Sequence, residues 1–443
     1  MSLARAFRRA RFFGPCFALG LALAQPAFAA DGALAPETRA QLVALANGEV
    51  QSFYAYGPGA LWTHADGSLD PAAGELVSLV ETAGEDGLSP ASLHAAELAD
   101  AVNQAQADRT PQALANAEVL LSRAFVAYVT ALRHADGTAM KYEAGQLEPH
   151  PYGGYQTLSE AAKAPSLADY IRDMAWMHPL YAPLRRALME DTAISPEDRQ
   201  LAIRNLERIR NIPAQPNGRH ILIDAANARL WMYDGNKAVD SMKVVVGKPE
   251  KQTPAYAGYI RSAFLNPYWN VPADMVRSII ARNVLNQGMA YLKRQGYEVI
   301  SKYGDDADVI DPHTVDWPAV QRGELKIFVR QLPGPRNSMG AMKFEFPNPY
   351  GVYLHDTPER DTLAGDSRQL SAGCIRLEDA KRLGSWLMEG DIHKLGNAPE
   401  QRIELPQPVP LYITYLTARV DNGQLAFGPD PYGRDGKALA ALD

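Results

Sequence analysis

Two neighbouring stretches, Tyr353-Leu-His-Asp-Thr-Pro358 and Leu370-Ser-Ala-Gly-Cys-Ile-Arg376, hold the residues on which the interpretation of this chain depends. They place a histidine, His355, nineteen positions before a cysteine, Cys374. A thiolate is a strong nucleophile, and an imidazole is the usual group that takes the proton from the thiol. The pattern predicts a cysteine nucleophile with a histidine base. The alternatives are a small buried cysteine and a histidine satisfied in the core.

The residues around the cysteine favour a reactive thiol. Gly373 lets the backbone turn sharply and lets a substrate approach closely. Apolar residues at helical spacing in 377–388 predict a helix shortly after Cys374. A helix N-terminus and the charge of Arg376 both stabilise a thiolate. We therefore expect the thiol to lie near the start of that helix.

These residues resemble the catalytic motif of the YkuD-type L,D-transpeptidases, in which a histidine and a spacer precede Ser/Thr-His-Gly-Cys and often Arg. Other segments resemble the large periplasmic YcbB-like branch of that family: Asn266-Pro-Tyr-Trp-Asn-Val-Pro272, Pro333-Gly-Pro-Arg-Asn337, Lys343-Phe-Glu-Phe-Pro-Asn348 and Tyr432-Gly-Arg-Asp435. One departure is Ala372, which stands where the motif has a second histidine. His355 is therefore the base that the resemblance implies.

The resemblance implies a role for each residue of the motif. Cys374 and His355 would be catalytic, and the backbone at Gly373 and Cys374 with the hydroxyl of Tyr353 would bind the oxyanion. Substrate would be bound by four more residues: Arg376, Ser371, Asn337 and Lys343. The donor and acceptor would be peptidoglycan stem peptides, joined through a cysteine thioester into 3,3 links, or 1,3 links as a variant. The chemistry requires no cofactor and no metal.

Other functions fit the same residues. Hydrolysis of the thioester would give an L,D-carboxypeptidase, and a D-amino acid as acceptor would give an exchange reaction. A catalytically dead wall-binding scaffold is the alternative from another class, with Ala372 as its mark. A papain-like peptidase is disfavoured because its histidine follows the cysteine at a distance.

The N-terminus predicts export. Residues 1–30 read as a signal peptide with an apolar core at 12–24, a cleavage site at Ala27-Phe-Ala29 and four basic residues, Arg5, Arg8, Arg9 and Arg11. A retained membrane anchor is the alternative. Cleavage would remove Cys16 and leave Cys374 as the sole thiol, with a net charge of −11. Such an acidic protein lacks the basic surface that nucleic acid needs. We expect a periplasmic protein without a stable membrane span.

Length and patterning predict an α+β protein with several domains. The chain has 443 residues, of which 47% are hydrophobic and 21% charged. We expect a helical scaffold domain at 31–195, a connector helix at 196–216, and a catalytic domain at 217–425. The catalytic domain is predicted as a β-rich YkuD-type sandwich with a helical capping insertion at about 273–326, followed by a polar tail at 426–443. No peptidoglycan-binding repeat is recognised, no metal-ligand spacing is found, and the oligomeric state stays open.

Finer patterns predict individual elements. Serine before proline, at Ser89-Pro90 and Ser195-Pro196, is typical of a helix start. Apolar spacing predicts helices at 71–80 and 114–132. Strands are predicted at 219–224, 229–233, 241–247, 326–330 and 410–420.

Overall fold

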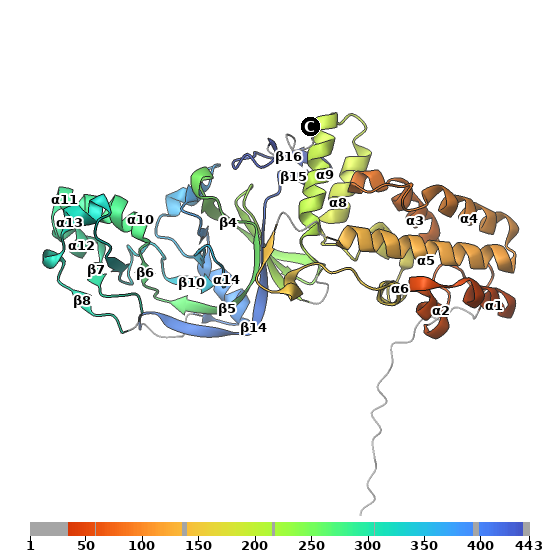
Figure 1. Ribbon diagram of the computed structural model, residues 1–443, viewed down its shortest axis with the longest axis horizontal. Helices are drawn as coiled ribbons and strands as arrows, with labels where there is room; N and C mark the ends of the chain where they lie inside the picture. The colour runs from red at the N-terminus through yellow and green to blue at the C-terminus, as the bar shows by residue number, and fades with distance from the viewer. Residues whose placement is uncertain are drawn as a thin grey trace, which may run out of the picture.

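The computed structural model describes residues 34–436 except 58, 135–139, 215–217, 305 and 393–397. The predicted signal peptide lies outside the described residues. Figure 1 shows three parts in a row: a helical part with α1 to α9, a large sheet in the middle, and a smaller insertion at the far end. The predicted α+β class, with helices first and a β-rich domain second, is confirmed.

The helical part is built around one long helix, α5. Its start is set by Thr110, whose side chain accepts the amide of Ala113, and by a proline at the first helical position. Helices α1, α3, α4 and α6 pack against it. The α-helices described in this part are α1 (Pro36–Leu45), α2 (Gln51–Tyr56), α3 (Ala72–Glu81), α4 (Ala95–Asp108), α5 (Pro111–Arg133), α6 (Gly154–Ala162), α7 (Leu167–Arg172), α8 (Tyr181–Glu190) and α9 (Pro196–Arg210).

The two serine–proline pairs differ in outcome. Ser195 caps α9 by accepting the amide of Asp198, as predicted. The prediction at Ser89 is wrong, because residues 90–94 form turns and the next helix begins only at Ala95. A serine–proline pair fixes only the first turn, so the residues after the pair decide whether a helix grows.

The large sheet closes on itself. Its order is β1-β5-β10-β11-β13-β4-β3-β2-β14, β12 adds to β4, and β14 also pairs with β5. The predicted sandwich is therefore joined at its edges around one hydrophobic core. Its strands are β1 (Lys141–Tyr142), β2 (Arg219–Asp224), β3 (Arg229–Asp234), β4 (Lys237–Gly247), β5 (Tyr256–Leu265), β10 (Met342–Glu345), β11 (Leu354–His355), β12 (Gln369–Ser371), β13 (Ile375–Leu377) and β14 (Gln401–Thr414).

The insertion is a small subdomain with its own core and its own sheet, of order β6-β9-β7-β8. The segment at 273–326 was expected to be helical, but it also carries two strands, which pair with one another. Its elements are β6 (Trp269–Asn270), α10 (Ala273–Met275), the π-helical η5 (Val276–Ala281), α11 (Arg282–Gln287), α12 (Ala290–Gln295), β7 (Tyr297–Ile300), β8 (Val309–Ile310), α13 (Trp317–Arg322) and β9 (Phe328–Gln331).

The end of the chain returns to the helical part. The strand predicted at 410–420 is broken after Thr414, and β15 (Ala418–Asp421) then pairs with β16 (Gln424–Phe427). Leu416 and Ala418 are buried in the core of the helical part. The polar tail predicted from 426 onward thus begins inside a hairpin, whose Phe427 packs against the core of the helical part. The structure describes this tail as far as residue 436.

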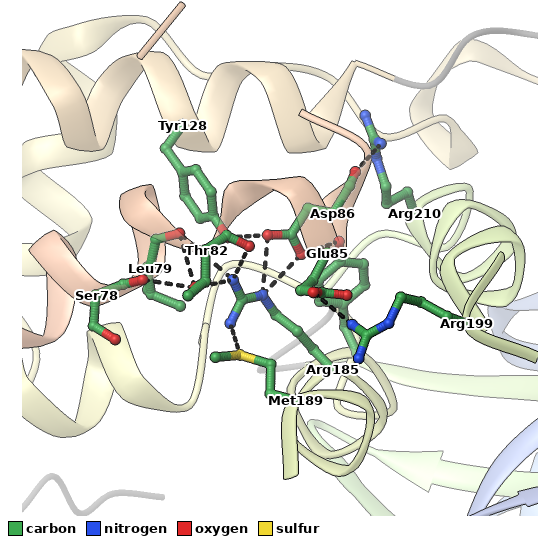
Figure 2. Close-up of polar contacts among 11 residues, drawn as sticks. Ser78, Leu79, Thr82, Glu85, Asp86, Tyr128, Arg185, Met189, Arg199 and Arg210 are labelled. Atoms are coloured by element: carbon green, nitrogen blue, oxygen red, sulfur yellow. Dashed lines mark hydrogen bonds and ion pairs between the residues drawn. The ribbon is translucent and has the colours of Figure 1, made fainter. Parts of the chain in front are cut away.

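A buried ion pair joins α8 to the turn after α3. The guanidinium of Arg185 contacts the carboxylate of Asp86 at 2.9 Å, and Tyr128 donates to the same carboxylate at 2.7 Å (Figure 2). From α9, Arg199 pairs with Glu85 at 2.6 Å, and Arg210 donates to the backbone of Asp86. The bonds from Arg199 and Arg210 hold α9, the predicted connector helix, against the turn after α3.

Candidate active site

The sheet register places the predicted histidine on the strand next to the one that follows the predicted cysteine. β11 and β13 are parallel neighbours, with Leu354 opposite Ile375 and His355 opposite Arg376. Leu354 and Ile375 are fully buried in the core. Side chains alternate along a strand, so His355 and Arg376 face the other way. Cys374 directly precedes β13, two positions before Arg376.

The imidazole of His355 is uncharged and held by one backbone hydrogen bond. Its Nδ1 donates to the backbone carbonyl of Asp356 at 2.6 Å, which leaves Nε2 as the nitrogen that accepts a proton. The side chain is 4% exposed. Burial lowers the pKa of His355 to about 4, against the effect of the Asp356 carbonyl. The ring is therefore uncharged near neutral pH and free to take a proton.

Cys374 carries a thiol in the free protein. Its Sγ contacts the carbonyl of Gly351 at 3.8 Å. Burial raises the pKa of Cys374, although the backbone of Tyr353 and the charge of Arg376 act to lower it. No hydrogen bond joins Sγ to the imidazole of His355 in this structure, which describes both residues. Catalytic hydrogen bonds are commonly long in free enzymes and shorten with substrate.

The helix predicted at 377–388 is present but begins three residues later than predicted. Three residues of β13 follow Cys374, and helix α14 (Ala380–Met388) begins only after Asp379, whose side chain accepts the amide of Arg382. The thiol therefore does not lie at a helix N-terminus. The apolar Ile375 and Leu377 alternate about Arg376, and this two-residue period extends the sheet.

The nucleophile loop, residues 371–374, is braced by several hydrogen bonds. Ser371 Oγ accepts the amide of Gly373 at 3.1 Å and donates to the carbonyl of Cys374 at 2.6 Å. Thr253 Oγ1 donates to the carbonyl of Gly373 at 2.8 Å. The amide of Cys374 has no hydrogen-bond partner among the described residues. Gly373 was predicted to offer its own amide to an oxyanion, but here that amide is taken.

Glycine is required at 373 for its backbone angle. Its φ is +117°, which side-chain-bearing residues rarely adopt. The preceding Ala372, which stands where the motif has histidine, is exposed.

Tyr353 can supply a second donor. Its hydroxyl forms no hydrogen bond with any described residue. Burial, with the nearby carboxylate of Glu345, raises the pKa of Tyr353, so the hydroxyl stays protonated.

The residues predicted to bind substrate are already engaged with protein groups. Arg376 pairs with Glu359 at 2.5 Å, not with the neighbouring acids after it. Lys343 lies opposite His355 and pairs with Glu400 at 2.7 Å and Glu345 at 3.1 Å. Burial acts to lower the pKa of Lys343, but these carboxylates hold it above its ordinary value. Lys343 is therefore protonated, and its positive charge is balanced by these two carboxylates.

Asn337 and Ser371 have structural contacts. Asn337 is 1% exposed, and its side-chain amide donates to the carbonyls of Pro267, Gln331 and Leu332. It ties the loop that follows β9 to the segment before β6. Ser371 braces the nucleophile loop through its two hydroxyl hydrogen bonds. Both side chains face protein groups and not an open site.

Three residues with a bearing on the site were not predicted: Thr253, Glu359 and Tyr432. Each contacts a partner that is distant in the sequence or on another element. Of these three, only Tyr432 lay in a segment that the sequence analysis singled out, and the resemblance at 432–435 assigned no role to that segment. Over the described ranges, no group of three or more His, Cys, Asp or Glu is arranged to hold a metal ion. Within the same ranges, no helix has the length and apolar character to cross a membrane.

Comparisons with known proteins identify both parts of the chain. The L,D-transpeptidase catalytic domain family YkuD matches residues 218–403, and a scaffold domain family matches residues 48–188. Residues 218–403 therefore belong to the YkuD family of L,D-transpeptidase catalytic domains. With the scaffold domain ahead of it, the chain has the YcbB-like arrangement, and the predicted family resemblance is confirmed.

The individual proteins that this chain resembles share less than a third of its residues over the matched segments. A Haemophilus influenzae protein, whose name places it provisionally among the L,D-transpeptidases, is 28% identical over 279 residues, or 61% of this chain and 55% of that protein. The chain thus spans about half the length of this curated relative. A mutant L,D-transpeptidase from Enterococcus faecium is 14% identical over 44% of this chain and 49% of that chain, with a TM-score of 0.23. An L,D-transpeptidase from Mycobacterium smegmatis is 13% identical over 44% and 59%, with a TM-score of 0.22.

Proposed function

We propose that this protein is a periplasmic peptidoglycan L,D-transpeptidase that works through a thioester on Cys374. The carrying observation is the register of β11 and β13, which pairs His355 with Arg376, two residues after Cys374, inside the matched catalytic domain. The neutral His355 ring supports its role as base. The free amide of Cys374 and the hydroxyl of Tyr353 are the proposed oxyanion donors.

The first half-reaction forms the thioester. Sγ of Cys374 attacks the carbonyl carbon between the third and fourth residues of a stem tetrapeptide, and its proton passes to Nε2 of His355. The carbonyl oxygen gains negative charge, which the amide of Cys374 and the hydroxyl of Tyr353 offset. One such donor is typically worth about 3 kcal/mol. The C–N bond then breaks, and His355 returns the proton to the leaving amine of D-alanine.

The second half-reaction restores the enzyme. The side-chain amine of a neighbouring stem attacks the thioester and gives its proton to His355, which passes it to the departing Sγ. One amide bond has been exchanged for another, so no energy source is consumed. We propose 3,3 links as the product and 1,3 links as the variant. Water in place of the amine would give the L,D-carboxypeptidase, and a free D-amino acid would give exchange.

The test is incubation with purified tetrapeptide muropeptides, followed by mass spectrometry. We expect crosslinked dimers that have lost D-alanine, absent with Cys374→Ala and reduced at least about 100-fold with His355→Gln. His313→Gln is the matched control, since His313 lies exposed on the insertion, and it should keep full activity.

The remaining outcomes separate the alternatives. Tripeptide monomers alone would mean hydrolysis, and an exchanged terminal residue would mean D-amino-acid exchange. Fragmentation of the dimers distinguishes 3,3 from 1,3 links. Intact substrate with the wild type, and no covalent adduct with a carbapenem, would contradict the enzyme proposal and favour a wall-binding scaffold.

A further inference from the structure

The nucleophile loop is held from outside by Thr253. This residue is 0% exposed and follows the short helix η4 (Pro249–Lys251). Its hydroxyl donates to the carbonyl of Gly373 at 2.8 Å and accepts the amide of Gly247 at 2.9 Å. Gly247 ends β4, and the carbonyl of Ser371 accepts the amide of the next residue, Lys248, at 3.0 Å. The loop 247–253 and the nucleophile loop are thus bonded at two points.

The bond from Thr253 sets the direction of a catalytic donor. The carbonyl of Gly373 and the amide of Cys374 belong to one peptide plane, in which C=O and N–H point in opposite directions. Fixing the carbonyl toward Thr253 therefore aims the amide of Cys374 away from Thr253. That amide has no partner of its own among the described residues. Gly373, with its unusual φ, would otherwise let this plane rotate.

Thr253 is itself held by a segment near the described C-terminus. Tyr432 donates its hydroxyl to the carbonyl of Gly247 at 2.6 Å and accepts the amide of Thr253 at 3.3 Å. Arg434 donates to the carbonyl of Thr253 at 3.2 Å. The ring of Tyr432 stacks on Tyr415, with centroids 5.2 Å apart. The resemblance at 432–435 is thus explained by contacts to the loop 247–253.

We propose that Thr253, supported by Tyr432, is a positioning residue that orients the Cys374 amide toward the oxyanion. The proposal deepens the proposed function and rests on it. The Thr253 hydroxyl bonds to the carbonyl of Gly373 and not to the thiol, so we expect it to act on acyl transfer through this peptide plane. Alkylation of the thiol passes through no oxyanion and serves as the internal reference.

The experiment compares two reactions of the same sulfur. Acylation by a carbapenem and alkylation by iodoacetamide are followed by mass spectrometry, in wild type, Thr253→Val and Thr253→Ser. We expect Thr253→Val to acylate about 10- to 100-fold more slowly and to lower kcat on muropeptides with little change in KM. Its alkylation rate should stay within about twofold of wild type. Thr253→Ser, which keeps the hydroxyl, should acylate near the wild-type rate.

A matched control and a second variant make the result decisive. In the insertion, Thr314 donates its hydroxyl to a backbone carbonyl at 2.7 Å, so Thr314→Val removes a similar bond away from the site and should leave both rates unchanged. Tyr432→Phe removes both hydroxyl contacts to the loop and decides the matter if Thr253→Val does not fold. A selective loss of acylation supports the proposal.

Two results would overturn the proposal. One is acylation of the variant at the wild-type rate, and the other is a parallel fall of acylation and alkylation in a folded variant. A wild type that is alkylated but never acylated would instead contradict the proposed function.

Discussion

Around the sulfur, both proposed catalytic groups are uncharged in the free protein. Burial favours the thiol form of Cys374 and the neutral ring of His355, so no thiolate is stored in the free protein. Charge is created only when the proton moves, and the amide of Cys374 then has an anion to bind. Arg376 lies next to this pair and forms an ion pair with Glu359, so the predicted binding of a substrate carboxylate would have to displace Glu359.

Freeing Arg376 should improve binding of the donor peptide. Glu359 is 61% exposed, and exposed ion pairs are worth at most about 1 kcal/mol, or about fivefold. We expect Glu359→Gln to lower KM for tetrapeptide stems by up to about fivefold with kcat unchanged. Steady-state kinetics measure both values.

The control for this variant is Glu324→Gln. Glu324 is 60% exposed and pairs with Arg322 in the insertion, so its loss should change neither kinetic constant. A higher KM in Glu359→Gln would mean that Glu359 contacts the substrate directly.

At the scale of elements, local patterns were predicted well and junctions poorly. The bounds of β2 match the predicted strand at 219–224, because a short apolar run, Ile221-Leu-Ile223, is bounded there by polar residues. The helix predicted after Cys374 starts later, because β13 takes the first apolar residues into the sheet. A two-residue period over three positions is too short to recognise in a sequence.

The start of α14 depends on one side chain. Asp379 accepts the amide of Arg382 at 3.0 Å, and the helix buries Leu383 and Leu387 under the sheet. We expect Asp379→Ala to lower the free energy of unfolding by about 1 kcal/mol. Asp379→Asn keeps an accepting oxygen and should cost much less. Urea unfolding measures both, and equal losses in the two variants would show that charge and not capping is responsible.

At the scale of the whole molecule, the contacts that matter join distant positions. Thr253 and Gly373 are 120 residues apart, and Tyr432 and Gly247 are 185 apart. No local pattern reveals such pairs, so Thr253 and Tyr432 could not be predicted, whereas Cys374 and His355 lie in one short motif. The segment near residue 432 also contacts α9 through a pair that is distant in the sequence, since Arg208 pairs with Asp435 at 2.7 Å.

Two histidines also meet where the helical part contacts the sheet. His178 precedes α8 and His220 lies on β2, with their Nε2 atoms 3.3 Å apart. Burial lowers the pKa of His220 to about 4, as it does for His355, and the pKa of His178 falls as well. All three rings are neutral in the folded protein near pH 7.

The protein should therefore lose stability in acid. Unfolded histidine titrates near pH 6.5, so between pH 6.5 and about 4 the unfolded chain binds more protons than the folded one. Stability is complete above pH 6.5 and falls toward pH 4, by about 3 kcal/mol for each ring with a pKa near 4. Urea unfolding at a series of pH values measures this slope.

Two variants check the assignment. His220→Gln should flatten the slope between pH 6.5 and 4, while the exposed His313→Gln should leave it unchanged. An identical slope in His220→Gln and wild type would assign the acid sensitivity to other groups.

The hydrogen bonds from Tyr432 give the maturation of this protein an order in time. The ribosome makes Cys374 well before it makes Tyr432, which lies 58 positions later. Until that ring reaches the end of β4, the loop that holds Thr253 lacks its two hydrogen bonds to Tyr432. Under the proposed mechanism, the ability to form the acyl-enzyme therefore arrives last, after the rest of the catalytic domain has been synthesised.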